Sequence, residues 1–149
     1  MDRYLYRGVN LSLYEATNGK LVPKASGQPF RQATYFGGDT YFGDGTVYGE
    51  SERNAVILHQ RDSNKHQTSG ISTTPVYENA KRYATHDGKY SSGYIYKIDT
   101  ELLASNGVIY YVVEEHATMP AIPGDKEVIL VARDFGTLPV EIVVEVVTV

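Results

Sequence analysis

Apolar residues recur at every second position in several short runs, most of them in the second half of the chain. This period is typical of β-strands with one buried face, and glycine, proline, asparagine or aspartate separates the runs. We predict strands at residues 4–9, 94–98, 108–113, 127–132 and 140–147. In the last strand the expected buried face consists of alternate residues: Val140, Ile142, Val144 and Val146.

Three other segments carry the signals of short helices. We predict these helices over residues 11–17, 51–60 and 76–85. Each segment begins near a residue whose side chain can accept a hydrogen bond from the first turn. These N-cap candidates are Asn10 or Ser12 for the first helix, Ser51 for the second and Thr74 for the third. Pro75 would take the first position of the third helix, which tolerates proline, and a short strand from Gly70 would lead into it. Asn18 and Gly19 would end the first helix.

Residues 24–50 are rich in glycine, tyrosine and phenylalanine. They are too broken for a long helix and too aromatic for disorder, so we predict an ordered loop region. The glycines lack the Gly and Lys spacing of a phosphate-binding P-loop.

Helices early in the chain and strands late indicate an α+β fold. A length of 149 residues fits one compact domain that covers residues 1–149.

Composition narrows the classes of function. A formal net charge of −4 argues against a dedicated nucleic-acid binder. Because the chain has no cysteine, disulfides, thiolate metal ligands and a cysteine nucleophile are excluded.

The first ten residues lack the apolar region of a signal peptide, and no run is long enough to span a bilayer, so we expect no targeting signal and no membrane partner. The histidines lack zinc-ligand spacing, and we expect structural or surface roles and no metal for His59, His66, His86 and His116.

Three short motifs, far apart in the sequence, are candidates for a functional site. They are Tyr6-Arg7-Gly8 on the first predicted strand, Gly70-Ile71-Ser72-Thr73-Thr74 before the third helix, and Gly124-Asp125-Lys126-Glu127 at the start of a late strand. Each motif alone has an ordinary explanation: a surface ion pair, a helix start and a charged turn, respectively. Their joint order and spacing is what favours a function.

In this order the motifs resemble those of the cholera-toxin-like clade of mono-ADP-ribosyltransferases. Members carry an arginine on the first strand, a Ser-Thr-Ser type triplet and a catalytic glutamate. The resemblance extends over residues 4–132 and includes the strand at residues 94–96 and the proline-bearing loop at residues 119–124. It implies two small, roughly perpendicular β-sheets with flanking helices and an NAD-binding cleft between them. It also implies that NAD is the substrate, and that no metal takes part.

The resemblance implies a role for each matching residue. Arg7 would bind the phosphates and ribose of NAD, because a planar guanidinium offers phosphate a fork of donors. Gly8, without a side chain, would leave its backbone open to the nicotinamide carboxamide. Cleavage of the glycosidic bond develops positive charge on the ribose, and Glu127 is the carboxylate expected to stabilise it. Ser72 would bind the ribose and hold Glu127, while Thr73 would support the strand geometry.

Two further candidates concern the acceptor and the nicotinamide. Asp125 precedes Glu127 by two residues, and in an extended chain both side chains would reach the same face. We expect Asp125 to position the acceptor. Arginine-modifying members of the clade carry Glu at that place and guanine-modifying members carry Gln, so the shorter Asp leaves the acceptor open. Tyr83, on the third predicted helix, would stack on the nicotinamide or line its pocket.

The implied function is that of a toxin or effector domain which transfers ADP-ribose from NAD to a macromolecule and releases nicotinamide. The domain would belong to a larger secreted protein and act in the cytoplasm of another cell, as in competition between bacteria. A protein acceptor is favoured, RNA or DNA is a second possible acceptor, and a cognate immunity protein is an expected partner. The same residues would also suit an NAD glycohydrolase, with water as the acceptor. A non-catalytic binding module would be favoured if Glu127 were exposed and remote from Arg7.

Overall fold

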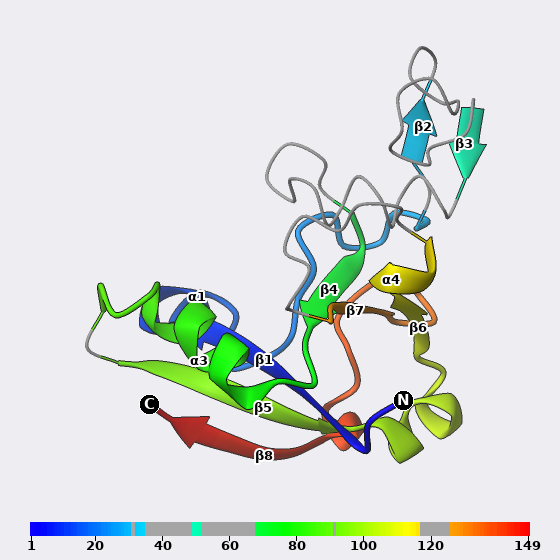
Figure 1. Ribbon diagram of the computed structural model, residues 1–149. Helices are drawn as coiled ribbons and strands as arrows, with labels where there is room; N and C mark the ends of the chain where they lie inside the picture. Colours follow the sequence, from blue (N-terminus) through cyan, green and yellow to red (C-terminus); the bar gives the residue numbers. More distant parts are fainter. Residues whose placement is uncertain (31, 35–48, 52–67, 91, 117–125) are drawn as a thin grey trace.

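Two antiparallel three-stranded sheets form most of the fold (Figure 1). The computed structural model describes residues 1–30, 32–34, 49–51, 68–90, 92–116 and 126–149. The first sheet has the strand order β1-β5-β8 and consists of β1 (Tyr4–Asn10), β5 (Gly93–Asp99) and β8 (Val143–Thr148). The second sheet has the order β4-β7-β6 and consists of β4 (Gly70–Thr73), β7 (Val128–Val131) and β6 (Ile109–Val112). A two-stranded sheet pairs β2 (Gln32–Thr34) with β3 (Gly49–Ser51).

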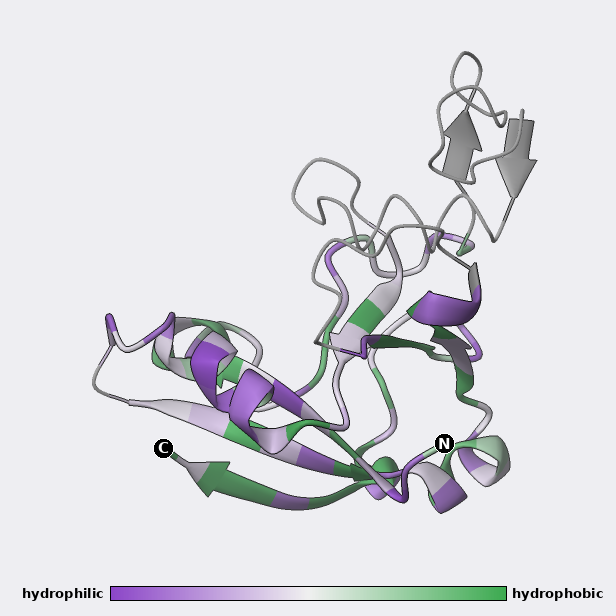
Figure 2. Ribbon diagram, in the orientation of Figure 1, coloured by the Kyte–Doolittle hydropathy of each residue, from purple (hydrophilic) through white to green (hydrophobic). Residues whose placement is uncertain are grey.

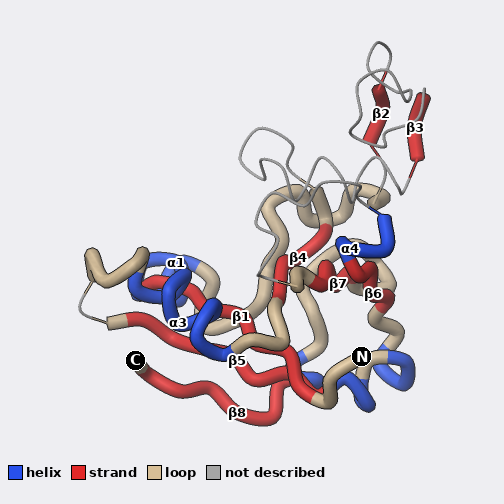
Figure 3. Tube along the Cα trace, in the orientation of Figure 1, coloured by secondary structure: helices blue, strands red, loops and turns tan. Residues whose placement is uncertain are grey.

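Short helices accompany the sheets. The described α-helices are α1 (Leu11–Ala16), α3 (Tyr77–Thr85) and α4 (Val113–His116). The described 3-10 turns are η1 (Thr100–Leu102), η2 (Ala104–Asn106) and η4 (Val140–Ile142). Figure 3 shows α1 and α3 beside the end of the first sheet where β5 begins. The predicted α+β class, with two small sheets of the ADP-ribosyltransferase type, is confirmed.

The main core lies between the two sheets. Alternate residues of β1 and β5 point into it, among them Leu5, Tyr96 and Ile98, which are at most 2% exposed. The second sheet contributes Ile71 and Leu130 to the same cluster. Figure 2 shows β7 coloured as largely hydrophobic, as expected for the central strand of a sheet that is buried on both faces.

The opposite face of the first sheet is covered by α3. Ala80 and Ala84 of this helix are fully buried against Ile95 of β5. The helix approaches β1 at Gly8, where an added Cβ would lie 1.8 Å from the carbonyl oxygen of Ala80. A side chain at position 8 would therefore force α3 away from the sheet.

The first predicted helix is confirmed as α1. Its N-cap is Asn10, whose Oδ1 accepts a hydrogen bond from the Leu13 amide at 2.8 Å. The helix ends before Asn18 and Gly19, which have φ values of 54° and 72°. Asparagine and glycine are the residues that most readily adopt such left-handed conformations.

The predicted start of the third helix is wrong. Val76, not Thr74, is the N-cap of α3, so Pro75 precedes the helix instead of opening it. The reason is a long-range contact, because both backbone groups of Thr74 are hydrogen-bonded to Tyr6 of β1. The Thr74 hydroxyl instead accepts the Val76 amide at 3.1 Å, a local turn that delays the helix.

The predicted buried face of the last strand is wrong at Val140, Val144 and Val146, which are exposed, while Ile142 is buried as predicted. The strand begins at Val143, because the preceding residues form the 3-10 turn η4 after Pro139. Val144 and Val146 are 47% and 42% exposed, whereas Val143 and Val147 are partly buried. β8 lies at the edge of the first sheet and pairs with β5 alone among the described strands, so the face of β8 that carries Val144 and Val146 is left partly exposed.

The remaining predicted strands agree with the structure within one or two residues, the usual uncertainty at strand ends. Val113, for example, opens α4 instead of ending β6. Ser51 is the last residue of β3, and the rest of the helix predicted over residues 51–60 lies outside the described residues. Most of the loop region predicted at residues 24–50 lies outside them as well, and its described part contains β2 and the start of β3, which were not predicted.

Candidate active site

The two main sheets are joined where β1 passes the end of β4. The Tyr6 amide donates to the Thr74 carbonyl at 2.7 Å, and the Thr74 amide donates to the Tyr6 carbonyl at 2.9 Å. These two bonds form a single antiparallel bridge. The bridge brings the next residue of β1, Arg7, to Ser72 of β4, 65 residues later in the sequence.

Arg7 lies on the face of β1 that turns toward the main core. Its Nη1 donates a hydrogen bond to the Ser72 carbonyl oxygen at 3.3 Å. Burial lowers the pKa of Arg7, while the charge of Glu127 and, less strongly, the phenol of Tyr96 oppose this shift. A guanidinium remains protonated in proteins, so Arg7 places a positive charge in the same partly buried region as Glu127.

Glu127 is held by a short hydrogen bond. The Ser72 hydroxyl donates to Oε2 of Glu127 at 2.5 Å, a length found when the acceptor is a carboxylate. The backbone of Glu127 is fixed too, because its carbonyl accepts the Val113 amide at 3.0 Å. Because Glu127 is only partly buried, the residue is held by these hydrogen bonds and still contacts solvent.

Three elements thus converge on one chain of contacts. Arg7 from β1 binds the backbone of Ser72, and the side chain of Ser72 from β4 binds Glu127 at the start of β7. A cation suited to phosphate and a carboxylate suited to a developing positive charge therefore share Ser72 as a common neighbour. The condition that would favour a non-catalytic module, with Glu127 exposed and remote from Arg7, is not met.

Thr73 has a structural contact beside this chain. It is 4% exposed, and its hydroxyl donates to the Val128 carbonyl at 2.7 Å. The bond ties β4 to β7 at the position directly after Glu127. Support of the strand geometry, the role expected for Thr73, is consistent with this contact.

The structure gives a reason for glycine at position 8 that differs from the predicted one. The close approach of α3 already requires the missing side chain. In an antiparallel strand, the amide and carbonyl groups of every second residue point to the same side. Those of Tyr6 point toward β4 and are hydrogen-bonded to Thr74. The amide and carbonyl of Gly8 therefore also turn away from β5. Binding of the nicotinamide carboxamide by these groups stays a prediction.

Two predicted residues are not brought to the site by the described contacts. Asp125 lies outside the described residues. Lys126, the residue between Asp125 and Glu127 in the sequence, has a φ of 52°, so the chain is not extended at Lys126. Tyr83 lies on α3 and is 45% exposed, and its contact with nicotinamide stays a prediction.

A comparison with known families identifies the type of domain. The sequence profile of NarE matches residues 4–130. The chain belongs to the NarE family. NarE is an ADP-ribosyltransferase-like family, so the chain is an ADP-ribosyltransferase-type domain. No curated protein matches the chain.

The NarE match contains every candidate site residue. These are Arg7, Gly8, Ser72, Thr73, Tyr83, Asp125 and Glu127. The matched region begins with β1 and ends within β7, so it includes the strands that carry Arg7 and Ser72, and also Glu127, which directly precedes β7. β8 lies beyond it and supplies none of these residues.

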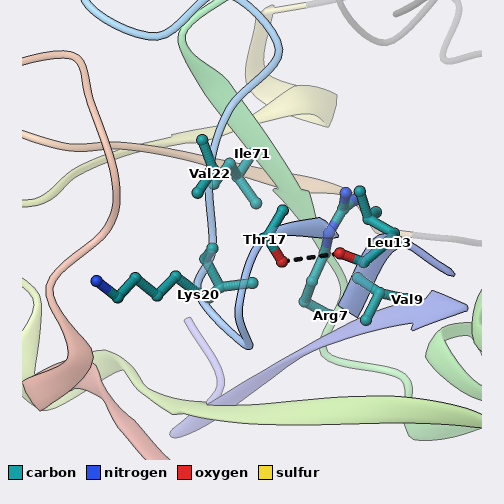
Figure 4. Close-up of a pocket in the computed structure, with 8 residues that line it drawn as sticks. Arg7, Val9, Leu13, Thr17, Lys20, Val22 and Ile71 are labelled. Atoms are coloured by element: carbon teal, nitrogen blue, oxygen red, sulfur yellow. Dashed lines mark hydrogen bonds between the residues drawn. The ribbon is translucent and has the colours of Figure 1, made fainter. Parts of the chain in front are cut away.

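A crevice opens beside Arg7 in this NarE-family domain (Figure 4). It lies among β1, α1, the segment after α1, and β4, and its lining residues are Arg7, Val9, Leu13, Thr17, Lys20, Leu21, Val22 and Ile71. Thr17 is fixed there by its hydroxyl, which donates to the Leu13 carbonyl at 2.8 Å. The stem of Lys20 forms one wall, and Figure 4 shows its ammonium pointing away from Arg7. Arg7 and Lys20 are the two cationic residues among those that line this crevice.

Sequence reasoning did not select Tyr96, which lies directly opposite Arg7 on β5. The strand at residues 94–98 was predicted, but which residue of β1 faces Tyr96 depends on a register that the sequence does not reveal.

The histidines give no sign of a metal site in the described part of the chain, which contains no group of three or more His, Cys, Asp or Glu side chains able to hold an ion. His86 caps the C-terminus of α3 and its ring contacts Tyr90 edge-on, while His116 ends α4. His59 and His66 lie outside the described residues. None of the described helices is both long and apolar enough to cross a membrane.

Proposed function

We propose that this NarE-family domain cleaves NAD, releases nicotinamide and transfers ADP-ribose to a macromolecular acceptor. The observation that carries the proposal is the contact chain from Arg7 through Ser72 to Glu127. Arg7 and Ser72 lie on β1 and β4, Glu127 directly precedes β7, and each residue stands in one of the three sequence motifs. The order of the motifs further supports a place in the cholera-toxin-like clade.

The reaction would proceed by cleavage of the bond between ribose C1′ and the nicotinamide nitrogen. Nicotinamide leaves with the bonding electron pair and becomes neutral, and the ribose ring carries the positive charge that develops. Glu127, held in one orientation by Ser72, stabilises this charge electrostatically. Arg7 binds the phosphates of NAD and keeps the ribose in place. The acceptor nucleophile then bonds to C1′ and loses its proton.

The acceptor is the least constrained part of the proposal. A protein is favoured, since a formal charge of −4 gives no general attraction to nucleic acid, and RNA or DNA is the second candidate. If water is the acceptor, the same site works as an NAD glycohydrolase. We propose further that the domain is a toxin or effector delivered into another cell, with an immunity protein as partner, because this is the habit of the clade that the motifs resemble.

The first test follows both products of the reaction. The purified domain is incubated with NAD labelled in its ADP-ribose part, with and without cell lysate, and nicotinamide release and label in protein and nucleic acid are measured. Removal of the Glu127 charge in Glu127→Gln should lower both by on the order of 100-fold or more, as loss of one transition-state stabilising group does. Glu141→Gln, at an exposed glutamate of η4, is the matched control.

Each outcome selects one function. Glu127-dependent label in protein or in nucleic acid would establish a transferase and identify the acceptor class. Nicotinamide release without label would identify a glycohydrolase. Absence of NAD turnover by the wild-type domain would contradict the proposal and leave a binding module with an ADP-ribosyltransferase-type fold.

A further inference from the structure

Two polar atoms next to the candidate site are buried without a hydrogen-bond partner among the described residues. They are Nε of Arg7 and the hydroxyl of Tyr96. Buried polar atoms in native proteins nearly always have a partner, so each such exception calls for an explanation. Arg7 and Tyr96 are register partners on β1 and β5, and both side chains lie on the core face of the first sheet. The two unpaired atoms therefore belong to facing residues whose side chains lie on the same face of this sheet.

The surroundings of Tyr96 keep its phenol neutral and its ring fixed. The residue is 2% exposed and belongs to the main core. The centroid of its ring lies 6.2 Å from that of Tyr14, on α1. Burial raises the pKa of Tyr96 to about 12, and the positive charge of Arg7 opposes this shift. A neutral phenol oxygen can accept a hydrogen bond from a guanidinium N–H.

Arg7 has a geometric need for such an acceptor. One N–H of its Nη1 is already donated to the Ser72 carbonyl, so a phosphate would bind the remaining N–H donors of the planar guanidinium. The orientation of that plane is fixed only when a second point of the group is also held. Nε is the point that faces inward, since it is buried, and Tyr96 is the residue that the strand register places opposite.

We propose that Tyr96 is a positioning residue for Arg7, and that its hydroxyl oxygen accepts the Nε–H when a dinucleotide phosphate engages the guanidinium. This inference rests on the proposed function. Tyr96 itself touches neither NAD nor the reacting atoms, and it acts through the orientation of Arg7. The proposal also explains why a tyrosine stands in this apolar core where phenylalanine would pack as well.

The test is Tyr96→Phe, which keeps the ring and removes the unpaired hydroxyl. The Tm of the free protein should stay the same or rise, because a buried polar atom without a partner is lost. The KM for NAD in nicotinamide release should rise about three- to tenfold, the effect of one net hydrogen bond, while kcat stays unchanged. The increase in Tm that NAD produces should shrink accordingly.

Tyr110→Phe, at a phenol of β6 that is 47% exposed, is the control for loss of a hydroxyl elsewhere. Wild-type KM and a wild-type NAD-induced shift in Tyr96→Phe would overturn the proposal. A raised KM accompanied by a lower Tm of the free protein would also overturn it, because Tyr96 would then act through the fold. A wild-type domain that does not respond to NAD would contradict the proposed function itself, and the wild-type measurements alone distinguish that case.

Discussion

Ser72 connects the two charged groups of the candidate site. Its hydroxyl donates to Oε2 of Glu127 at 2.5 Å, while its backbone carbonyl accepts from Arg7. Removal of the hydroxyl in Ser72→Ala leaves Glu127 without the donor that orients it. A hydrogen bond to a charged group contributes roughly 1.5–3 kcal/mol, so we expect the rate of nicotinamide release to fall about 10- to 150-fold.

The loss should appear in catalysis and not in folding, because Ser72 is only partly buried and its backbone bonds in β4 remain. Thermal unfolding of the same preparation measures this. Ser105→Ala, at an exposed serine of η2, is the control variant. An unchanged rate in Ser72→Ala would contradict the assigned role, and a rate loss that follows a large drop in Tm would make the role structural.

Motif order was enough to select the residues that the structure brings together, but not to select Tyr96. Arg7, Ser72 and Glu127 each stand in a short recognisable motif, and the bridge between Tyr6 and Thr74 makes the first two neighbours. Tyr96 has no motif, since its place opposite Arg7 follows from the pairing of β1 with β5. Such pairing is a property of the assembled sheet.

Helix α3 packs closely against β1 at Gly8. An added Cβ at Gly8 would lie 1.8 Å from the Ala80 carbonyl oxygen, and backbone cannot yield as a flexible side chain can. Gly8→Ala should therefore displace α3 and lower the free energy of unfolding by about 1–3 kcal/mol, the usual cost of overpacking. Chemical denaturation of the two proteins gives this difference.

Gly136→Ala serves as the control for the glycine substitution. The atoms nearest to its added Cβ belong to the exposed side chain of Asp134, with Oδ1 at 3.1 Å, so a small side-chain shift relieves the contact and the backbone stays in place. If Gly8→Ala unfolds at the same denaturant concentration as the wild type, then α3 is not packed against β1 as the structure has it.

Secondary elements were predictable where a local pattern determines them. The alternating strands at residues 94–98 and 127–132, and the capped helix α1, follow from neighbouring residues alone. The start of α3 was mispredicted because a bond to β1 holds Thr74 in an extended conformation. The buried face of β8 was mispredicted because η4 shortens the strand, and because an edge strand can leave valines exposed.

At the scale of the whole molecule, both sheets depend on one core that includes a tyrosine. Tyr96 has its pKa raised to about 12 from an ordinary value of 10.0, because burial disfavours the phenolate. The folded state therefore binds this proton more tightly than the unfolded state does. The corresponding stability is fully present below pH 10.0 and is lost as pH rises through the folded pKa of about 12.

The free energy of unfolding of the wild type should consequently fall as the pH is raised from 10.0 toward 12, because the buried phenol ionises less readily in the folded state than in the unfolded state. Tyr96→Phe cannot ionise in the core, so its stability should fall less over the same range. Denaturant unfolding at a series of alkaline pH values compares the two proteins, and Tyr110→Phe should follow the wild type. If the free energy of unfolding falls equally with pH in the wild type and in Tyr96→Phe, ionisation of Tyr96 is not coupled to folding. The Tyr96 hydroxyl would then be exposed to solvent and not buried between the sheets.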